Sequence, residues 1–134
     1  MLPGTRREAR ERALALLYEA ESKQEAPGSV LAELPVAPEA FVVELVRGVE
    51  AEEPRIDALI SGHAIGWTID RMPVVDRVLL RMATYELLAR PDVPTGVVIS
   101  EAVELAKEYS TEESGRFVNG VLATIAGVVR NPQA

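Results

Sequence analysis

Apolar residues recur at intervals of three and four along nearly the whole chain, and proline or glycine marks each break. This spacing is typical of amphipathic helices, and no strand-like alternation of useful length competes with it. We expect an all-α fold of about seven helices. A short helix is expected after Ser29, within the loop 26–38. The other six have the approximate ranges 5–24, 38–50, 54–64, 73–90, a helix that follows the break at 90–96 and runs to 109, and 110–130.

Helix starts are marked by capping residues and prolines. Thr5 with Glu8 and Ser110 with Glu113 have the spacing of capping boxes. Pro38, Pro54 and Pro73 suit first turns of helices. The 134 residues suggest a single domain, which loop 26–38 and connection 66–72 divide into an N-terminal half of about 1–65 and a C-terminal half of about 73–130. Short connections favour antiparallel neighbours in a compact bundle.

The segment 73–90 is apolar almost all round, which predicts a central, buried helix. Glu86 falls inside its apolar stripe, so this carboxylate needs a partner or a helix end to receive it, and a structural role is favoured over a catalytic one. A charged edge, where a second protein could dock or which could simply be solvated, is formed by Asp76, Arg77 and Arg81.

In the last helix, the stretch GRFVNGVL contains Asn119-Gly120, a strong hairpin-turn signal. An apolar stripe with helical spacing passes through this dipeptide, so the helix interpretation is favoured. The stripe consists of Val118, Val121, Leu122, Ile125, Val128 and Val129. Gly120, Ala123 and Gly127 form a face of small residues, which predicts close approach of a neighbouring backbone.

Two surfaces suggest RNA binding, each with an ordinary alternative. At the start of the last helix, Phe117, Arg116 and Asn119 could stack bases and hold phosphate, or Phe117 could complete the core while Arg116 pairs with a carboxylate. In the first helix, Arg6, Arg7 and Arg10 form one edge. Tyr18 points in nearly the same direction as Arg7, about 20° away around the helix axis and roughly 16 Å further along that axis. That face could hold a single strand or be a solvated charged face.

The charge distribution separates a basic start from an acidic body. Net charge is −7, which argues against binding nucleic acid through bulk electrostatics. Residues 1–12 nevertheless carry a net +2, which leaves −9 for the rest of the chain. The sequence has no cysteine, a single histidine (His63), no phosphate-binding glycine loop, no metal-spaced cluster and no nucleophile motif. We therefore expect a non-enzymatic protein without cofactor or metal, and a cytoplasmic one, because no secretory signal or membrane span is evident.

Four segments together resemble the NusB family of transcription antitermination factors. They are RREARERALALLYE, VVDRVLLRMATYELL, DVPTGVVISEAVELAKEYS and SGRFVNGVL. The resemblance implies an all-helical fold of two small bundles at right angles and a role in antitermination of ribosomal RNA operons. It implies binding of single-stranded boxA RNA together with the ribosomal protein NusE, and assembly with other Nus factors and RNA polymerase. Some members of the family dimerise, so a homodimer is a further expectation.

The resemblance also implies residue roles. It assigns RNA contacts to Arg6, Arg7, Arg10, Tyr18, Arg116, Phe117 and Asn119, and partner contacts to Asp76, Arg77, Arg81 and Glu113. Ser100 stands where the family usually has asparagine. Two alternatives remain at this point: a helical protein-binding scaffold, and an RNA-targeting domain like that of certain ribosomal RNA methyltransferases. The second is disfavoured because the chain lacks a cysteine nucleophile and room for a catalytic domain.

Overall fold

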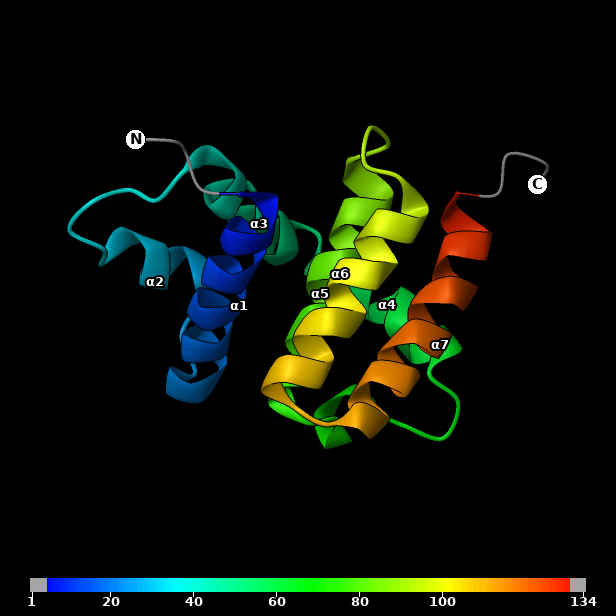
Figure 1. Cartoon of the computed structure of the whole chain (residues 1–134). Coiled ribbons are helices and arrows are strands. Elements are labelled where there is room, and N and C mark those ends of the chain that lie inside the picture. Colours follow the sequence, from blue (N-terminus) through cyan, green and yellow to red (C-terminus); the bar gives the residue numbers. More distant parts are fainter. Residues whose placement is uncertain (1–4, 131–134) are drawn as a thin grey trace.

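The computed structural model describes residues 5–130, and regular structure in this part is helical throughout (Figure 1). This confirms the predicted all-α class. The elements are α1 (Arg6–Lys23), α2 (Pro27–Ala32), α3 (Ala40–Ala51), α4 (Glu53–His63), the 3-10 turn η1 (Ile69–Arg71), α5 (Val74–Ala89), α6 (Thr95–Tyr109) and α7 (Glu112–Val129).

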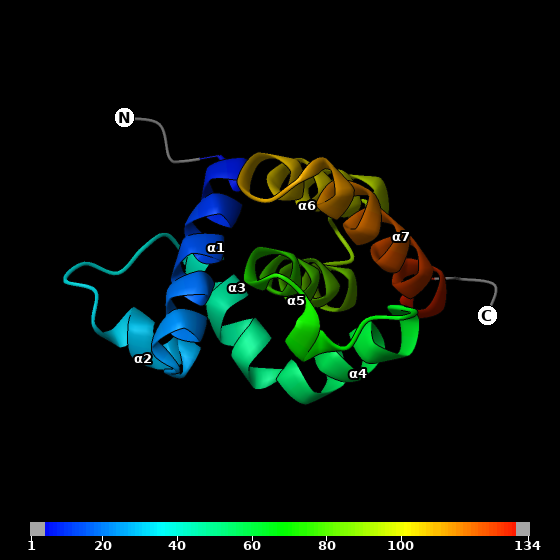
Figure 2. The same cartoon turned by 90° about the horizontal axis from the view of Figure 1, so that it is seen from below.

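Helix α5 is the centre of the molecule, as its all-round apolar sequence predicts. Figure 2 shows α5 enclosed by the other long helices, and it packs against α1, α3, α4, α6 and α7. Leu79 and Leu80 face different sides of α5, yet both are fully buried, because neighbouring helices cover most of its surface and leave only a partly exposed stripe. That stripe consists of Arg77, Arg81, Tyr85 and Leu88. The position of every other long helix is therefore defined by its contact with α5.

The helices around α5 form two groups. Helices α1, α2 and α3 pack on one another, while α6 and α7 form an antiparallel pair. The sequence divides the chain near residue 65, which places α4 with the N-terminal group. In the structure α4 packs mainly against α5 and α7, and it buries Ile56 and Ile60 completely. The chain thus passes between the groups at the α3–α4 junction.

The capping prediction is confirmed for α1 and wrong for α7. Thr5 and Glu8 form a complete capping box. At α7 the N-cap is Thr111, whose hydroxyl accepts a hydrogen bond from the Ser114 backbone N–H at 3.0 Å. Glu113 instead binds Arg116. The helix begins one residue later than Ser110 would allow, because two hydroxyl residues stand side by side and the second makes the cap.

Other boundaries differ by one to three residues. The short second helix begins at Pro27, before Ser29, and α3 begins at Ala40 rather than at Pro38. The connection 66–72 contains the unpredicted 3-10 turn η1. Proline in the first turn explains the start of α2 and of α4, because proline has no N–H to leave unsatisfied there.

Asn119 and Gly120 lie inside α7, which confirms that the turn interpretation fails. The close packing predicted at Gly120 does not occur among residues 5–130, since no atom beyond the adjoining turns of α7 lies within 4 Å of the position that a Cβ would take at Gly120 or Gly127. Close packing occurs at Gly48 of α3 instead, where a Cβ would overlap the ring of Tyr85 on α5. The tight helix crossing is therefore between α3 and α5.

These two glycines give opposite predictions for the same substitution. Gly48→Ala should lower the free energy of unfolding by about 1–3 kcal/mol or more, because the added methyl displaces the Tyr85 ring from a packed crossing. Gly120→Ala, the matched control, should raise it by up to about 1 kcal/mol, because alanine is the better helix former and meets open space. Urea denaturation measures both. Equal effects of the two substitutions would contradict this packing.

Candidate nucleic-acid and partner interfaces

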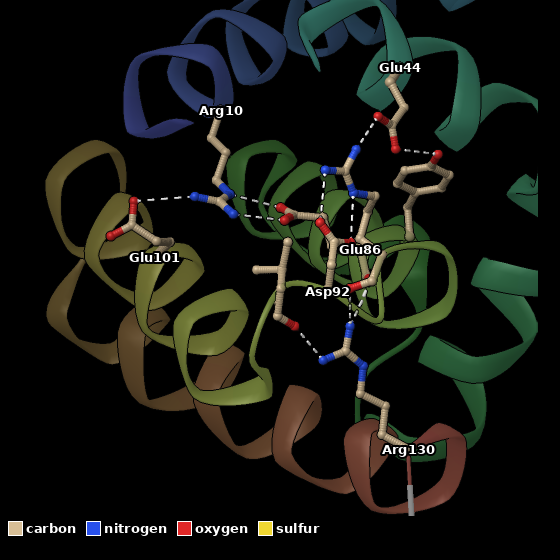
Figure 3. A network of polar contacts seen from close by, with 9 residues as sticks. Arg10, Glu44, Glu86, Asp92, Glu101 and Arg130 are labelled. Carbon is tan, nitrogen blue, oxygen red and sulfur yellow. Dashed lines mark hydrogen bonds and ion pairs between the residues drawn. The ribbon is translucent and has the colours of Figure 1, made fainter. Parts of the chain in front are cut away.

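Arg10 is buried, which is not where the sequence places it. Its guanidinium donates two 2.8 Å hydrogen bonds to the carboxylate of Glu86, and Glu101 lies 3.7 Å away (Figure 3). Arg10 and Glu86 are 4% and 2% exposed. Burial alone would lower the pKa of Arg10, but the hydrogen bonds and charge of Glu86 outweigh it, and the pKa is raised. Arg10 is thus the partner that the carboxylate of Glu86 requires, and it offers almost no surface to RNA.

Arg6 and Arg7 remain at the surface at the start of α1. Arg7 bridges to α6, with its guanidinium 3.6 Å from Glu101 and 3.3 Å from Glu108. Arg6 is exposed, and its guanidinium carbon lies over the ring of Phe41, 4.5 Å from the centroid. Among residues 5–130 no carboxylate lies within ion-pair distance of Arg6. Of the three predicted arginines, Arg6 has the charge least neutralised by the protein.

Tyr18 lies on the α1 face that borders α6. It is 45% exposed, and its direction is close to that of Glu11, seven residues earlier. Glu11 accepts a 2.7 Å hydrogen bond from the Tyr109 hydroxyl at the end of α6. That hydrogen bond raises the pKa of Tyr109 to about 12. Sequence reasoning missed Tyr109, an exposed ring on this border, because nothing local to it signals the contact with α1.

The start of α7 presents the other predicted RNA residues. Arg116 is exposed and donates a 2.7 Å hydrogen bond to Glu113, so its charge is partly neutralised. Asn119 is also exposed. Phe117 is half-buried against the core, and its ring lies 5.9 Å from that of Trp67 at an interplanar angle of 59°. Trp67 was not predicted from the sequence, since the contact joins residues fifty positions apart.

A cavity of about 260 Å³ lies beside this aromatic pair. We call it the Asp76 socket, and it is lined by Trp67, Pro73, Asp76, Thr111, Glu113, Ser114 and Phe117. Asp76 is only 3% exposed, and its Oδ1 has no hydrogen-bond partner among the described residues. A buried carboxylate oxygen without a partner is costly, and a cation entering the socket would relieve that cost.

Arg77 and Arg81 do not form a solvated edge. Arg77 donates to Glu21 of α1 at 2.9 Å and to the Ile69 carbonyl at 3.0 Å. Arg81 makes a bidentate contact with Asp57 of α4 and a 2.7 Å hydrogen bond to Glu21. These pairs tie α5 to α1 and α4, so the two arginines have few donors left for another protein.

The structure brings Phe117 together with Asp76 and Glu113, and not with Arg6 or Arg7. The arginine end of α1 meets the last turn of α5 through Glu86, whereas the Asp76 socket lies at the first turn. Asp76 and Glu86 are ten residues apart on α5, which corresponds to about 15 Å along the helix axis. No described hydrogen bond or ion pair joins Arg6 or Arg7 directly to Phe117 or Asn119, but Arg7 reaches Glu108, which lies four residues before α7 begins.

Residues 5–130 lack two further kinds of feature. No three His, Cys, Asp or Glu side chains within residues 5–130 are grouped so that they could hold a metal ion. No helix in that part of the chain is both long and apolar enough to cross a bilayer.

The chain is a small all-helical protein with a cationic helix start and an acidic socket. Charged surfaces of this kind are typical of a protein that binds other macromolecules. A family profile described as NusB family matches residues 7–127. The transcription antitermination protein NusB of Saccharopolyspora erythraea is 51% identical over 132 residues, which cover 93% of this chain and 88% of the relative. The chain belongs to the NusB family. The family comprises transcription antitermination factors and not enzymes.

Solved structures of NusB proteins have the same fold as this chain. NusB of T. maritima superimposes with a TM-score of 0.83 at 40% identity and covers 93% of this chain and 92% of its own. A crystal structure of the antitermination factors NusB and NusE in complex with double-stranded RNA gives a TM-score of 0.78 at 32% identity, with 92% of this chain and 96% of that chain covered.

The Arg10–Glu86 pair makes a prediction about stability. Arg10→Met should lower the free energy of unfolding by about 3–5 kcal/mol, because it leaves the Glu86 carboxylate buried without a partner. The double variant Arg10→Met with Glu86→Leu should lose markedly less than the two single variants combined. Guanidinium unfolding of all three provides the comparison. Strictly additive losses would show that the two side chains do not act as a pair.

Proposed function

We propose that this chain is an antitermination factor that binds boxA RNA of ribosomal RNA operons as a heterodimer with NusE, and joins other Nus factors and RNA polymerase in that state. The observation that carries the RNA part is Arg6 and Arg7 at the surface of α1, in a family whose solved relatives include a NusB–NusE complex with RNA. The protein part is supported by the Asp76 socket.

The RNA surface runs along α1, with Arg6 and Arg7 at its start and Tyr18 further along the face. Arginine holds phosphate, and an exposed tyrosine ring stacks on an unpaired base, which suits single-stranded boxA. Arg116 and Asn119 at the start of α7 form a second contact for a strand long enough to reach them. Because Glu101, Glu108 and Glu113 neutralise part of this charge, affinity depends on additional contacts from the partner.

The Asp76 socket suits a protein partner better than RNA. Its polar groups include the carboxylates of Asp76 and Glu113, which repel phosphate. Its walls include the rings of Trp67 and Phe117, which favour a cation held near their faces. A lysine or arginine side chain of the partner meets both requirements: its apolar stem contacts the rings and its charge approaches the Asp76 carboxylate, which has no described hydrogen-bond partner at Oδ1. Phe117 then belongs to the partner surface at least as much as to the RNA surface.

Reversing a charge at the start of α1 tests the RNA surface. Arg6→Glu should weaken binding of boxA RNA to the heterodimer by roughly tenfold and reduce the salt dependence, because a phosphate contact becomes a repulsion. Arg55→Glu, the same charge change at an exposed position on α4, is the control and should have little effect. Filter binding over a range of salt concentrations measures both. If the two variants bind RNA equally well, the α1 site is wrongly assigned.

Removing the charge of the socket tests the partner surface. Asp76→Asn should weaken NusE binding by about tenfold or more, because a desolvated ion pair is lost, and should leave the free protein as stable or more stable. Glu33→Gln, an exposed carboxylate distant in sequence, is the control. Calorimetric titration with NusE in the absence of RNA gives the affinities. Unaltered affinity of the Asp76 variant would exclude the socket from the interface.

A further inference from the structure

Phe41, on the first turn of α3, is surrounded by three guanidinium groups. The guanidinium carbon of Arg6 lies 4.5 Å from the ring centroid, that of Arg90 lies 5.3 Å away and that of Arg10 lies 5.6 Å away. The ring is half-buried and packs against the edge of the core. The arrangement is favourable because the face of an aromatic ring carries partial negative charge and attracts the guanidinium cations.

Only one of the three guanidinium groups is available to a ligand. Arg10 is held by Glu86 inside the protein. Arg90 is held by Glu44 at 2.7 Å and by Asp92 at 3.1 Å (Figure 3). Arg6 is exposed and has no carboxylate within ion-pair distance in the described chain, so the Phe41 ring is the group that orients it.

We infer that Phe41 is a positioning residue of the RNA surface: it holds the Arg6 guanidinium so that the open face stacks on a base of single-stranded RNA and the N–H edge reaches phosphate. This inference rests on the proposed RNA-binding function. A free arginine side chain loses rotamer freedom when it binds, and a guanidinium already resting on a ring loses less. Phe41 itself has no need to contact RNA.

A double-mutant cycle tests this role, with boxA RNA and the NusE heterodimer at fixed salt. Phe41→Leu should weaken RNA binding by about two- to fivefold, which corresponds to an exposed cation–ring contact. Phe41→Tyr, which keeps an aromatic face, should bind like the unchanged protein. In an Arg6→Ala background, Phe41→Leu should have no further effect, because its only route to RNA is through Arg6. Thermal unfolding checks that each variant folds, and Phe41→Met replaces the leucine variant if that one does not.

The outcomes separate this inference from the function on which it rests. If Arg6→Ala weakens binding but Phe41→Leu does not, the positioning role is overturned and the RNA surface stands. An equal effect of Phe41→Leu with and without Arg6 also overturns the positioning role, because Phe41 would then act by another route. If neither Arg6→Ala nor Arg7→Glu weakens RNA binding, the α1 surface itself fails.

Discussion

The buried ion pair between Arg10 of α1 and Glu86 of α5 is the constraint on which the arrangement of this molecule depends. A charged group away from water is tolerated only with a partner in good geometry, and both hydrogen bonds here are 2.8 Å long. The surrounding network is continuous: Arg130 donates to the backbone carbonyls of Glu86 and Arg90 at the end of α5, and Arg90 in turn binds Glu44 of α3 (Figure 3). The pair therefore fixes the rotation of α1 about its axis relative to α5.

That rotation determines which arginines reach solvent. With Arg10 directed inward, Arg7 lies against α6 and Arg6 lies over Phe41 at the start of α3. Arg10 thus reaches the last turn of α5 through Glu86, Arg7 lies along α6 as far as Glu108, and the Asp76 socket lies at the first turn of α5. Surfaces of opposite charge suit the proposed function, in which α1 binds RNA and the Asp76 socket receives a cationic side chain of the protein partner. In the proposed function, the local cationic surface of α1 is what lets a chain of net charge −7 bind RNA.

The sequence predicts the fold well because the signals for helices are local. Periodicity, Pro54 in the first turn of α4 and the Thr5–Glu8 capping box place the helices to within one to three residues. Pro38 and Pro73 lie before the first turns they were predicted to occupy, and the cap of α7 fails because Ser110 and Thr111 are adjacent. Arg10 could have been predicted as buried: it precedes Leu14 and Leu17 by four and seven residues on one helix face, and Glu86 in an apolar stripe demands a cation. Phe41, Trp67 and Tyr109 had no such signal, because their roles arise from contacts between distant segments.

In the proposed function, α1 divides its arginines between an internal role for Arg10 and an RNA-binding role for Arg6 and Arg7. The most direct test is an NMR titration of the NusE heterodimer with boxA RNA that follows the side-chain Nε–H signals of the arginines. The signals of Arg6 and Arg7 should shift strongly on RNA binding, while that of Arg10, hydrogen-bonded to Glu86, should stay where it is. A large shift of the Arg10 signal, or unmoved signals from Arg6 and Arg7, would contradict the account.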